Sequence, residues 1–130
     1  GLGAVTLGST ALVLGMVIAF NKDYAVPPAL KLSVVLGLLL PFLLGTGFGA
    51  CLSSQLSGHW VGGIRSGAGG LPIVKWSRTG GDLRVAHFFG IHAMHFIPAF
   101  GLTLHAMRIP PLQSRLAIWT FAVLHTVFAA

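Results

Sequence analysis

Histidine is the residue type with the clearest chemical potential in this chain. The sequence holds six histidines but only two acidic residues. His87, His92, His95 and His105 fall in or beside one apolar stretch, and His125 lies in the next one. Neutral imidazole binds haem iron and other metals, and it can also carry a proton. Ionisable side chains inside apolar helices are candidates for function, so these histidines are the first residues to consider.

Helical spacing indicates which of these rings can meet. His92 and His95 are three residues apart, so their rings should converge on one helix face. If the two stretches form a helical hairpin with its turn near residue 110, His125 reaches the depth of residues 96–98, within about one helical turn of His95. Such a pair would suit bis-histidine ligation of haem b or another metal.

Other functions for the histidines stay open. His92 and His95 could line a proton path or a transport route for a polar substrate, and His87 is a further tentative ligand. The simplest alternative is that the rings only bond to backbone carbonyls, hydroxyls or water.

Composition indicates the setting in which these rings must work. Hydrophobic residues make up 55% of the 130 residues, and charged residues only 8%. A soluble domain has about 25% charged residues with which to cover its surface. The formal charge of +6 comes from single basic residues placed between apolar runs, which is typical of membrane topology signals and argues against a nucleic-acid interface.

Four apolar runs have the length that a helix needs to cross a bilayer, which is about 20 residues. The sequence therefore predicts an all-α, integral membrane helical bundle in a single domain. Its four transmembrane helices are expected at about 2–20, 30–52, 85–107 and 112–130. Both ends of the chain fall inside apolar runs, so we expect this domain to be part of a longer protein.

Small residues at helical spacing predict close packing between these helices. Steps of three or four residues place them on one face of a helix, where they let two backbones approach. The first run carries Ala4, Gly8, Ala11, Gly15 and Ala19, and the second ends with the pair Gly45 and Gly49. Pro41 and Pro98 lie inside the second and third runs, where we expect kinks.

A long Gly-rich loop, residues 53–84, separates the second and third runs and is expected outside the membrane. Asp82 stands directly before the third run, where its carboxylate can cap the helix. Arg84 is placed to pair with Asp82, and Trp76 suits the membrane interface. No catalytic constellation is recognisable, because the two acids, Asp23 and Asp82, both lie outside the apolar runs.

A further motif spans the end of this loop and the start of the third run. It consists of Trp76-Ser77, Thr79-Gly80-Gly81-Asp82-Leu83-Arg84, His87-Phe88, Gly90 and His92-Ala93. With this motif the chain resembles a family of uncharacterised bacterial multi-spanning membrane proteins. The resemblance implies a longer chain in the bacterial cytoplasmic membrane, and it implies no activity. The family often has Gln at the position of His95 and Pro at that of Ala86. An axial haem ligand should not be replaceable by an amide, so the resemblance favours His87 and His92 over His95.

These observations predict a membrane subunit, or a fragment of a larger membrane assembly, that packs against other membrane subunits or further helices of the same protein. A haem b-binding electron carrier is one alternative, and a small transporter or proton path lined by His92 and His95 is the other.

Overall fold

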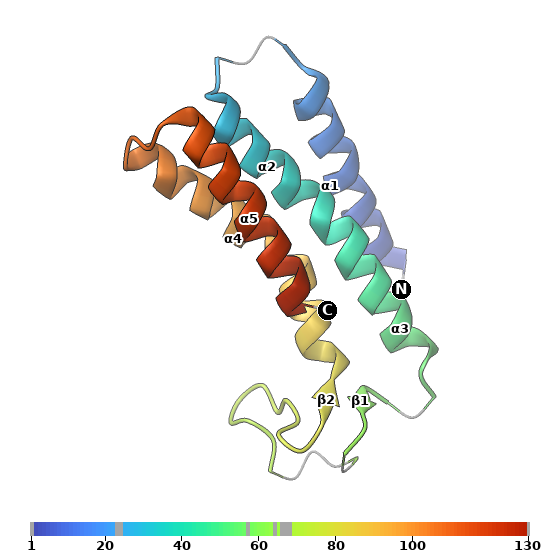
Figure 1. The fold of residues 1–130 in the computed structure, drawn as a ribbon. Helices are drawn as coiled ribbons and strands as arrows, with labels where there is room; N and C mark the ends of the chain where they lie inside the picture. Colours follow the sequence, from blue (N-terminus) through green and yellow to red (C-terminus); the bar gives the residue numbers. More distant parts are fainter. Residues whose placement is uncertain (1, 23–24, 57, 64, 66–68, 130) are drawn as a thin grey trace.

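The computed structural model describes residues 2–22, 25–56, 58–63, 65 and 69–129, and it is mostly helical (Figure 1). The helices are α1 (Leu2–Phe20), α2 (Pro28–Leu40), the π-helical turn η1 (Pro41–Gly45), α3 (Thr46–Ser54), α4 (Leu83–Ala106) and α5 (Pro111–Ala129). Two short strands, β1 (Trp60–Val61) and β2 (Gly81–Asp82), pair antiparallel, with Trp60 opposite Asp82.

The helical rods match the four apolar runs. α2, η1 and α3 follow one another without a break and form one long helix, Pro28–Ser54. The mainly helical fold is therefore confirmed, although the small sheet within the loop was not predicted. Both short connections, α1 to α2 and α4 to α5, lie at one end of the bundle, and the β1–β2 segment lies at the other (Figure 1).

The long helix changes its winding at Pro41. Proline has no backbone N–H, and its ring collides with the carbonyl four residues earlier in an α-helix. The chain responds with the π-turn Pro41–Gly45, in which the wider winding relieves that collision. The kink expected at Pro41 thus takes the form of a π-turn, whereas Pro98 lies inside an uninterrupted α4.

Small residues on both helices let the long helix pack closely against α4. Ser33, Gly37, Pro41 and Gly45 are buried at steps of four residues. On α4 the buried residues are Gly90, Ala93, Ile97 and Gly101, also at helical spacing. A Cβ added to Gly37 would lie 2.6 Å from the Pro98 ring, and one added to Gly45 would lie 2.6 Å from Ile91 Cγ2. A Cβ on Gly101 would overlap the Ser33 side chain. The two backbones are therefore as close as glycine permits.

The small-residue face of α1 packs on this long helix. Ala11 and Gly15 are buried, and Gly8 faces Phe42 and Thr46. Ala19 is exposed, and the Ala4 side chain lies outside the part of the chain that the structure describes. The predicted stripe thus works as a packing face over its middle. Ala93 and Ile97 of α4 also form a core with Ile118 and Ala122 of α5, and Leu36 of the long helix packs against it.

Among the described residues, two helices, Pro28–Ser54 and Leu83–Ala106, are long and apolar enough to cross a membrane, judged by length and composition. Core helices of soluble proteins can meet the same criteria, but those helices are mostly buried. Here only 22% of each apolar segment is buried inside the chain. Val5–Phe20 is a shorter apolar helix.

The glycine contact predicts a specific instability. Replacing Gly37 by Ala places a methyl group against the Pro98 ring, and such overpacking costs about 1–3 kcal/mol. We expect a lower midpoint of thermal unfolding in detergent for Gly37→Ala. Gly47→Ala is the matched control, because a Cβ at Gly47 would meet nothing within 4 Å. A helical alanine there should stabilise the protein slightly. Equal midpoints for the two variants would contradict the close approach of the helices.

Candidate functional site

A groove of about 580 Å³ lies between α1, the end of the long helix and α4. We call it the histidine groove, because His87, His92 and His95 of α4 all line it. Its other walls are largely apolar. They include Val5, Leu7 and Gly8 of α1, and Thr46, Gly49, Ala50 and Leu52 of α3. Among the described lining residues, none is Lys, Arg, Asp or Glu.

The π-turn fixes His87 in the groove wall. His87 Nδ1 lies 3.1 Å from the carbonyl oxygen of Gly45, the last residue of η1. The same ring lies against Gly49, where an added Cβ would be 3.3 Å from His87 Cε1. Gly45 and Gly49, predicted from the sequence as a packing pair, thus leave room for an imidazole as well as for a helix.

His92 and His95 follow on the same face of α4. The His92 ring stacks on Phe88 with centroids 4.0 Å apart, and its Nδ1 lies 2.7 Å from the Phe88 carbonyl oxygen. The centroids of His92 and His95 are 5.4 Å apart, as their spacing of three residues predicts. His95 is exposed, so it is the most accessible of these rings.

His125 lies apart from the groove. Its Nε2 is 3.0 Å from the Phe89 carbonyl oxygen, and the ring is buried among Phe89, Phe96 and Phe121. No ring contact joins His125 to His95 within the described residues. Bis-histidine ligation between facing helices needs one free imidazole nitrogen on each side of the metal. The structure instead spreads three histidines of one helix along the groove wall. The described residues contain no group of three or more His, Cys, Asp or Glu close enough to hold a metal ion.

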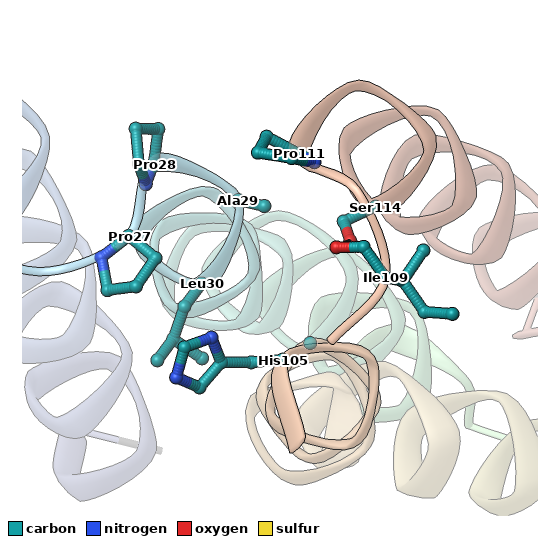
Figure 2. Close-up of a pocket in the computed structure, with 9 residues that line it drawn as sticks. Pro27, Pro28, Ala29, Leu30, His105, Ile109, Pro111 and Ser114 are labelled. Carbon is teal, nitrogen blue, oxygen red and sulfur yellow. Dashed lines mark hydrogen bonds between the residues drawn. The ribbon is translucent and has the colours of Figure 1, made fainter. Parts of the chain in front are cut away.

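A second, smaller cavity of about 80 Å³ lies at the end of the bundle that holds the short connections. Figure 2 shows His105 and Leu30 on one side of it, and Pro111 and Ser114 of α5 on the other. The Ser114 hydroxyl donates to the Ile109 carbonyl, so this group is already used inside the protein. The cavity has room for little more than water, which leaves the histidine groove as the candidate site.

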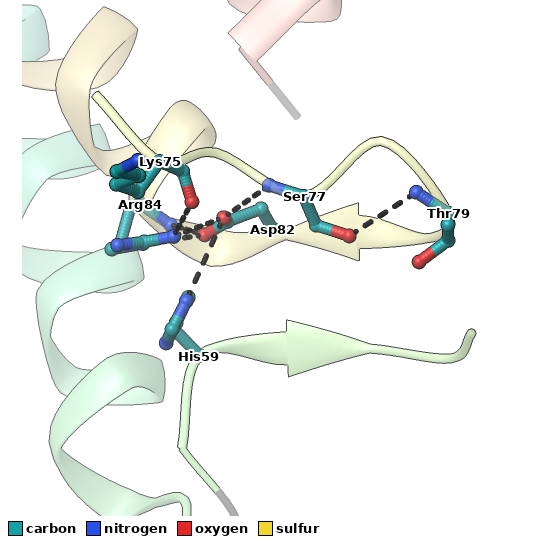
Figure 3. A network of polar contacts seen from close by, with 6 residues as sticks. All are labelled: His59, Lys75, Ser77, Thr79, Asp82 and Arg84. Atoms are coloured by element: carbon teal, nitrogen blue, oxygen red, sulfur yellow. Dashed lines mark hydrogen bonds and ion pairs between the residues drawn. The ribbon is translucent and has the colours of Figure 1, made fainter. Parts of the chain in front are cut away.

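A polar cluster around Asp82 holds the loop against the start of α4 (Figure 3). Asp82 caps the helix by accepting from the Arg84 backbone N–H at 3.0 Å. It also accepts from Arg84 Nη2 at 2.7 Å and from the Ser77 N–H at 3.0 Å. Arg84 in turn donates to the Lys75 carbonyl at 2.7 Å, and His59 Nε2 lies 3.7 Å from Asp82 Oδ2.

A series of aromatic rings connects this cluster to the groove. Trp76 contacts Phe88 edge-on, with centroids 5.4 Å apart, and Phe88 stacks on His92. Trp76 of the loop thus packs against Phe88, and Phe88 packs against the His92 ring. The sequence predicts Trp76 at a membrane interface, and the structure shows it packed on Phe88.

The ionised state of Asp82 stabilises the cluster. Burial by itself raises the pKa of Asp82, but hydrogen bonds from Arg84 and Ser77, together with the Arg84 charge, outweigh it. The pKa falls from its ordinary value of 3.8 to about 2. A carboxyl with a lowered pKa stabilises the fold above its unfolded pKa and loses that contribution as the pH falls through the folded pKa.

Two features of this site could not be predicted from the sequence, namely the wall from α1 and the contact between His87 and Gly45. The wall formed by Val5, Leu7 and Gly8 depends on how α1 leans on the long helix, which no local pattern encodes. The bond from His87 to Gly45 joins residues 42 positions apart. Pro41 was the one available signal, because it marks the helix where the π-turn occurs.

The Asp82 cluster generates a pH-dependent prediction. We expect Asp82→Asn to lower the stability by about 2 kcal/mol at pH 7, in line with the pKa shift. The difference from the wild type should shrink between about pH 4 and pH 2, as the wild-type carboxyl takes up its proton. Thermal unfolding followed by tryptophan fluorescence measures it. Arg78→Gln, at an exposed cation of the same loop, is the control and should change little. A pH-independent difference would contradict the role given to the charge.

Comparison of the chain with protein-family models, with curated proteins and with solved structures gives no match. The resemblance to bacterial multi-spanning proteins therefore stays a prediction from the motif residues alone.

Proposed function

We propose that this protein is a four-span integral membrane protein that binds a membrane-soluble amphiphile in the histidine groove. The observation that carries the proposal is the groove itself, with about 580 Å³ of mostly apolar space and three histidines on one wall. Sites for small molecules commonly enclose about 300–1,000 Å³, with apolar walls and a few polar groups that orient the ligand.

Four spans are supported by the outward faces of the shorter helices. α1 and α5 have 19 residues each, which is close to the length that a bilayer core requires. Their exposed residues include Val13 and Val17 on α1, and Leu116, Leu124 and Val127 on α5. A lipid environment accepts such faces, whereas water does not. The four rods lie side by side, with the polar connections at the two ends (Figure 1).

The ligand chemistry follows from the walls. The apolar side chains of α1 and α4 suit a hydrocarbon chain. Several of the lining residues, such as Leu7, Ala50 and Met94, are exposed on the outside of the bundle, so a molecule dissolved in the bilayer could enter from the side. The histidines supply the polar groups that would hold a head group. The absence of charged side chains among the described lining residues favours a neutral ligand.

A second candidate function is that of a subunit in a larger membrane assembly. Gly8, Gly49 and Ala50 line the groove and would let the side chains of another helix enter it. In that case a partner helix, and not a small molecule, would fill the groove, and the protein would be purified together with that partner.

The four-span arrangement predicts a labelling pattern. Single cysteines are introduced into a Cys51→Ser background and treated with a membrane-impermeant maleimide in intact and in permeabilised cells. We expect positions at the two ends of the bundle to react from opposite sides of the membrane, with Lys22 and Arg108 on one side and Gly3, Arg78 and Phe128 on the other. Labelling of Lys22 and Gly3 from the same side would show that α1 does not cross.

Filling the groove should displace its ligand. Ala50 is exposed and lines the groove, so Ala50→Phe places a ring in the space without removing a contact. We expect native mass spectrometry to show at least about ten-fold less copurified small molecule, because overpacking by a ring costs over about 1.4 kcal/mol. Ala99→Phe, at an exposed position of α4 outside the groove, should keep the ligand. Equal retention in both variants would rule out the groove as the site.

A further inference from the structure

Two of the groove histidines are held in the same tautomer by the protein. His87 Nδ1 lies 3.1 Å from the Gly45 carbonyl oxygen, and His92 Nδ1 lies 2.7 Å from the Phe88 carbonyl oxygen. A carbonyl oxygen only accepts hydrogen bonds, so Nδ1 must carry the proton and donate in both cases. In the neutral ring the lone pair then resides on Nε2, and both Nε2 atoms are hydrogen-bond acceptors.

His125 shows that this choice is not general in the protein. There Nε2 contacts a carbonyl oxygen, that of Phe89, so Nε2 is the donor and Nδ1 the acceptor. His125 does not line the groove. His87 and His92 thus have Nε2 as the acceptor nitrogen, whereas the buried His125 has Nδ1 as the acceptor.

His87 and His92 therefore offer a ligand acceptor nitrogens and no donors. No Lys or Arg is among the described lining residues, so the groove has no permanently charged partner for a phosphate or carboxylate. A ketone, ether or ester oxygen would place its lone pairs against those of Nε2. A hydroxyl group would instead donate to Nε2, and it could also interact with the Thr46 and Ser53 side chains, which line the same groove.

We infer that the histidine groove selects a neutral amphiphile that ends in a hydroxyl group, namely a long-chain or isoprenoid alcohol or phenol, over one whose end carries only acceptors. This inference rests on the proposed function, since it requires that a ligand occupies the groove. Nε2 of His92 is the acceptor to test, because His87 also stabilises the π-turn through Gly45.

The test compares two probes that share one hydrocarbon chain, hexadecanol and hexadecyl methyl ether. Both are titrated into the full chain in phosphatidylcholine nanodiscs, and bound ligand is measured by native mass spectrometry. We expect the alcohol to bind about three- to ten-fold more tightly, which is the net effect of one hydrogen bond. In His92→Phe, whose ring can still stack on Phe88, that preference should fall, and an unchanged preference would show that Nε2 of His92 is not the acceptor.

The outcomes separate the two proposals. Equal binding of alcohol and ether would overturn the inference and leave the groove proposal standing. Binding of neither probe would overturn the groove proposal and the inference together. A second measurement does not depend on a variant, since ¹⁵N NMR of histidine-labelled protein reports which ring nitrogen carries the proton. We expect protonated Nδ1 on His87 and His92, and protonated Nε2 on His125. Protonated Nε2 on His87 and His92 would also overturn the inference.

Discussion

The close approach of α4 to the long helix Pro28–Ser54 is the constraint on which the rest of the structure depends. Gly37, Gly45 and Gly101 stand where a Cβ would overlap the opposite helix. This contact fixes the register between the two helices, and the register places His87 opposite the Gly45 carbonyl and against Gly49. A bulkier contact would separate the backbones, and the imidazole would lose its partner. The chemistry of the groove wall is thus a consequence of backbone packing.

Pro41 and Asp82 also help to position the groove histidines, Pro41 through the π-turn and Asp82 through the start of α4. Pro41 causes the π-turn that ends at Gly45. The Gly45 carbonyl that accepts from His87 Nδ1 therefore lies where the helix changes its winding. Asp82 ties the loop to the first turn of α4, and Trp76 then packs on Phe88, the ring beneath His92. Of the three groove histidines, His87 is therefore held by the long helix, and His92 is held by the Phe88 carbonyl and ring of α4 itself. Both are held in the same tautomer.

The sequence predicted those features that depend on local pattern. Apolar runs gave the helices, the position of Asp82 before such a run gave the cap, and the three-residue spacing gave the proximity of His92 to His95. It could not predict features that depend on how helices lean on one another. From the expected hairpin we placed His125 at the depth of residues 96–98. Its ring does contact Phe96 there, but its Nε2 faces the Phe89 carbonyl, a contact that no local pattern encodes. The groove wall formed by α1 could not be predicted for the same reason, since it depends on how α1 packs on the long helix.

The most direct test of the ligand groove is nuclear Overhauser spectroscopy on the isotope-labelled protein in nanodiscs containing hexadecanol. We expect contacts from the methylene groups of the alcohol to the side chains of Ala50, Ile91 and Met94, which line the groove. Contacts confined to outward residues such as Leu124 and Val127 of α5 would contradict it. They would mean that the alcohol only surrounds the protein as bulk lipid does.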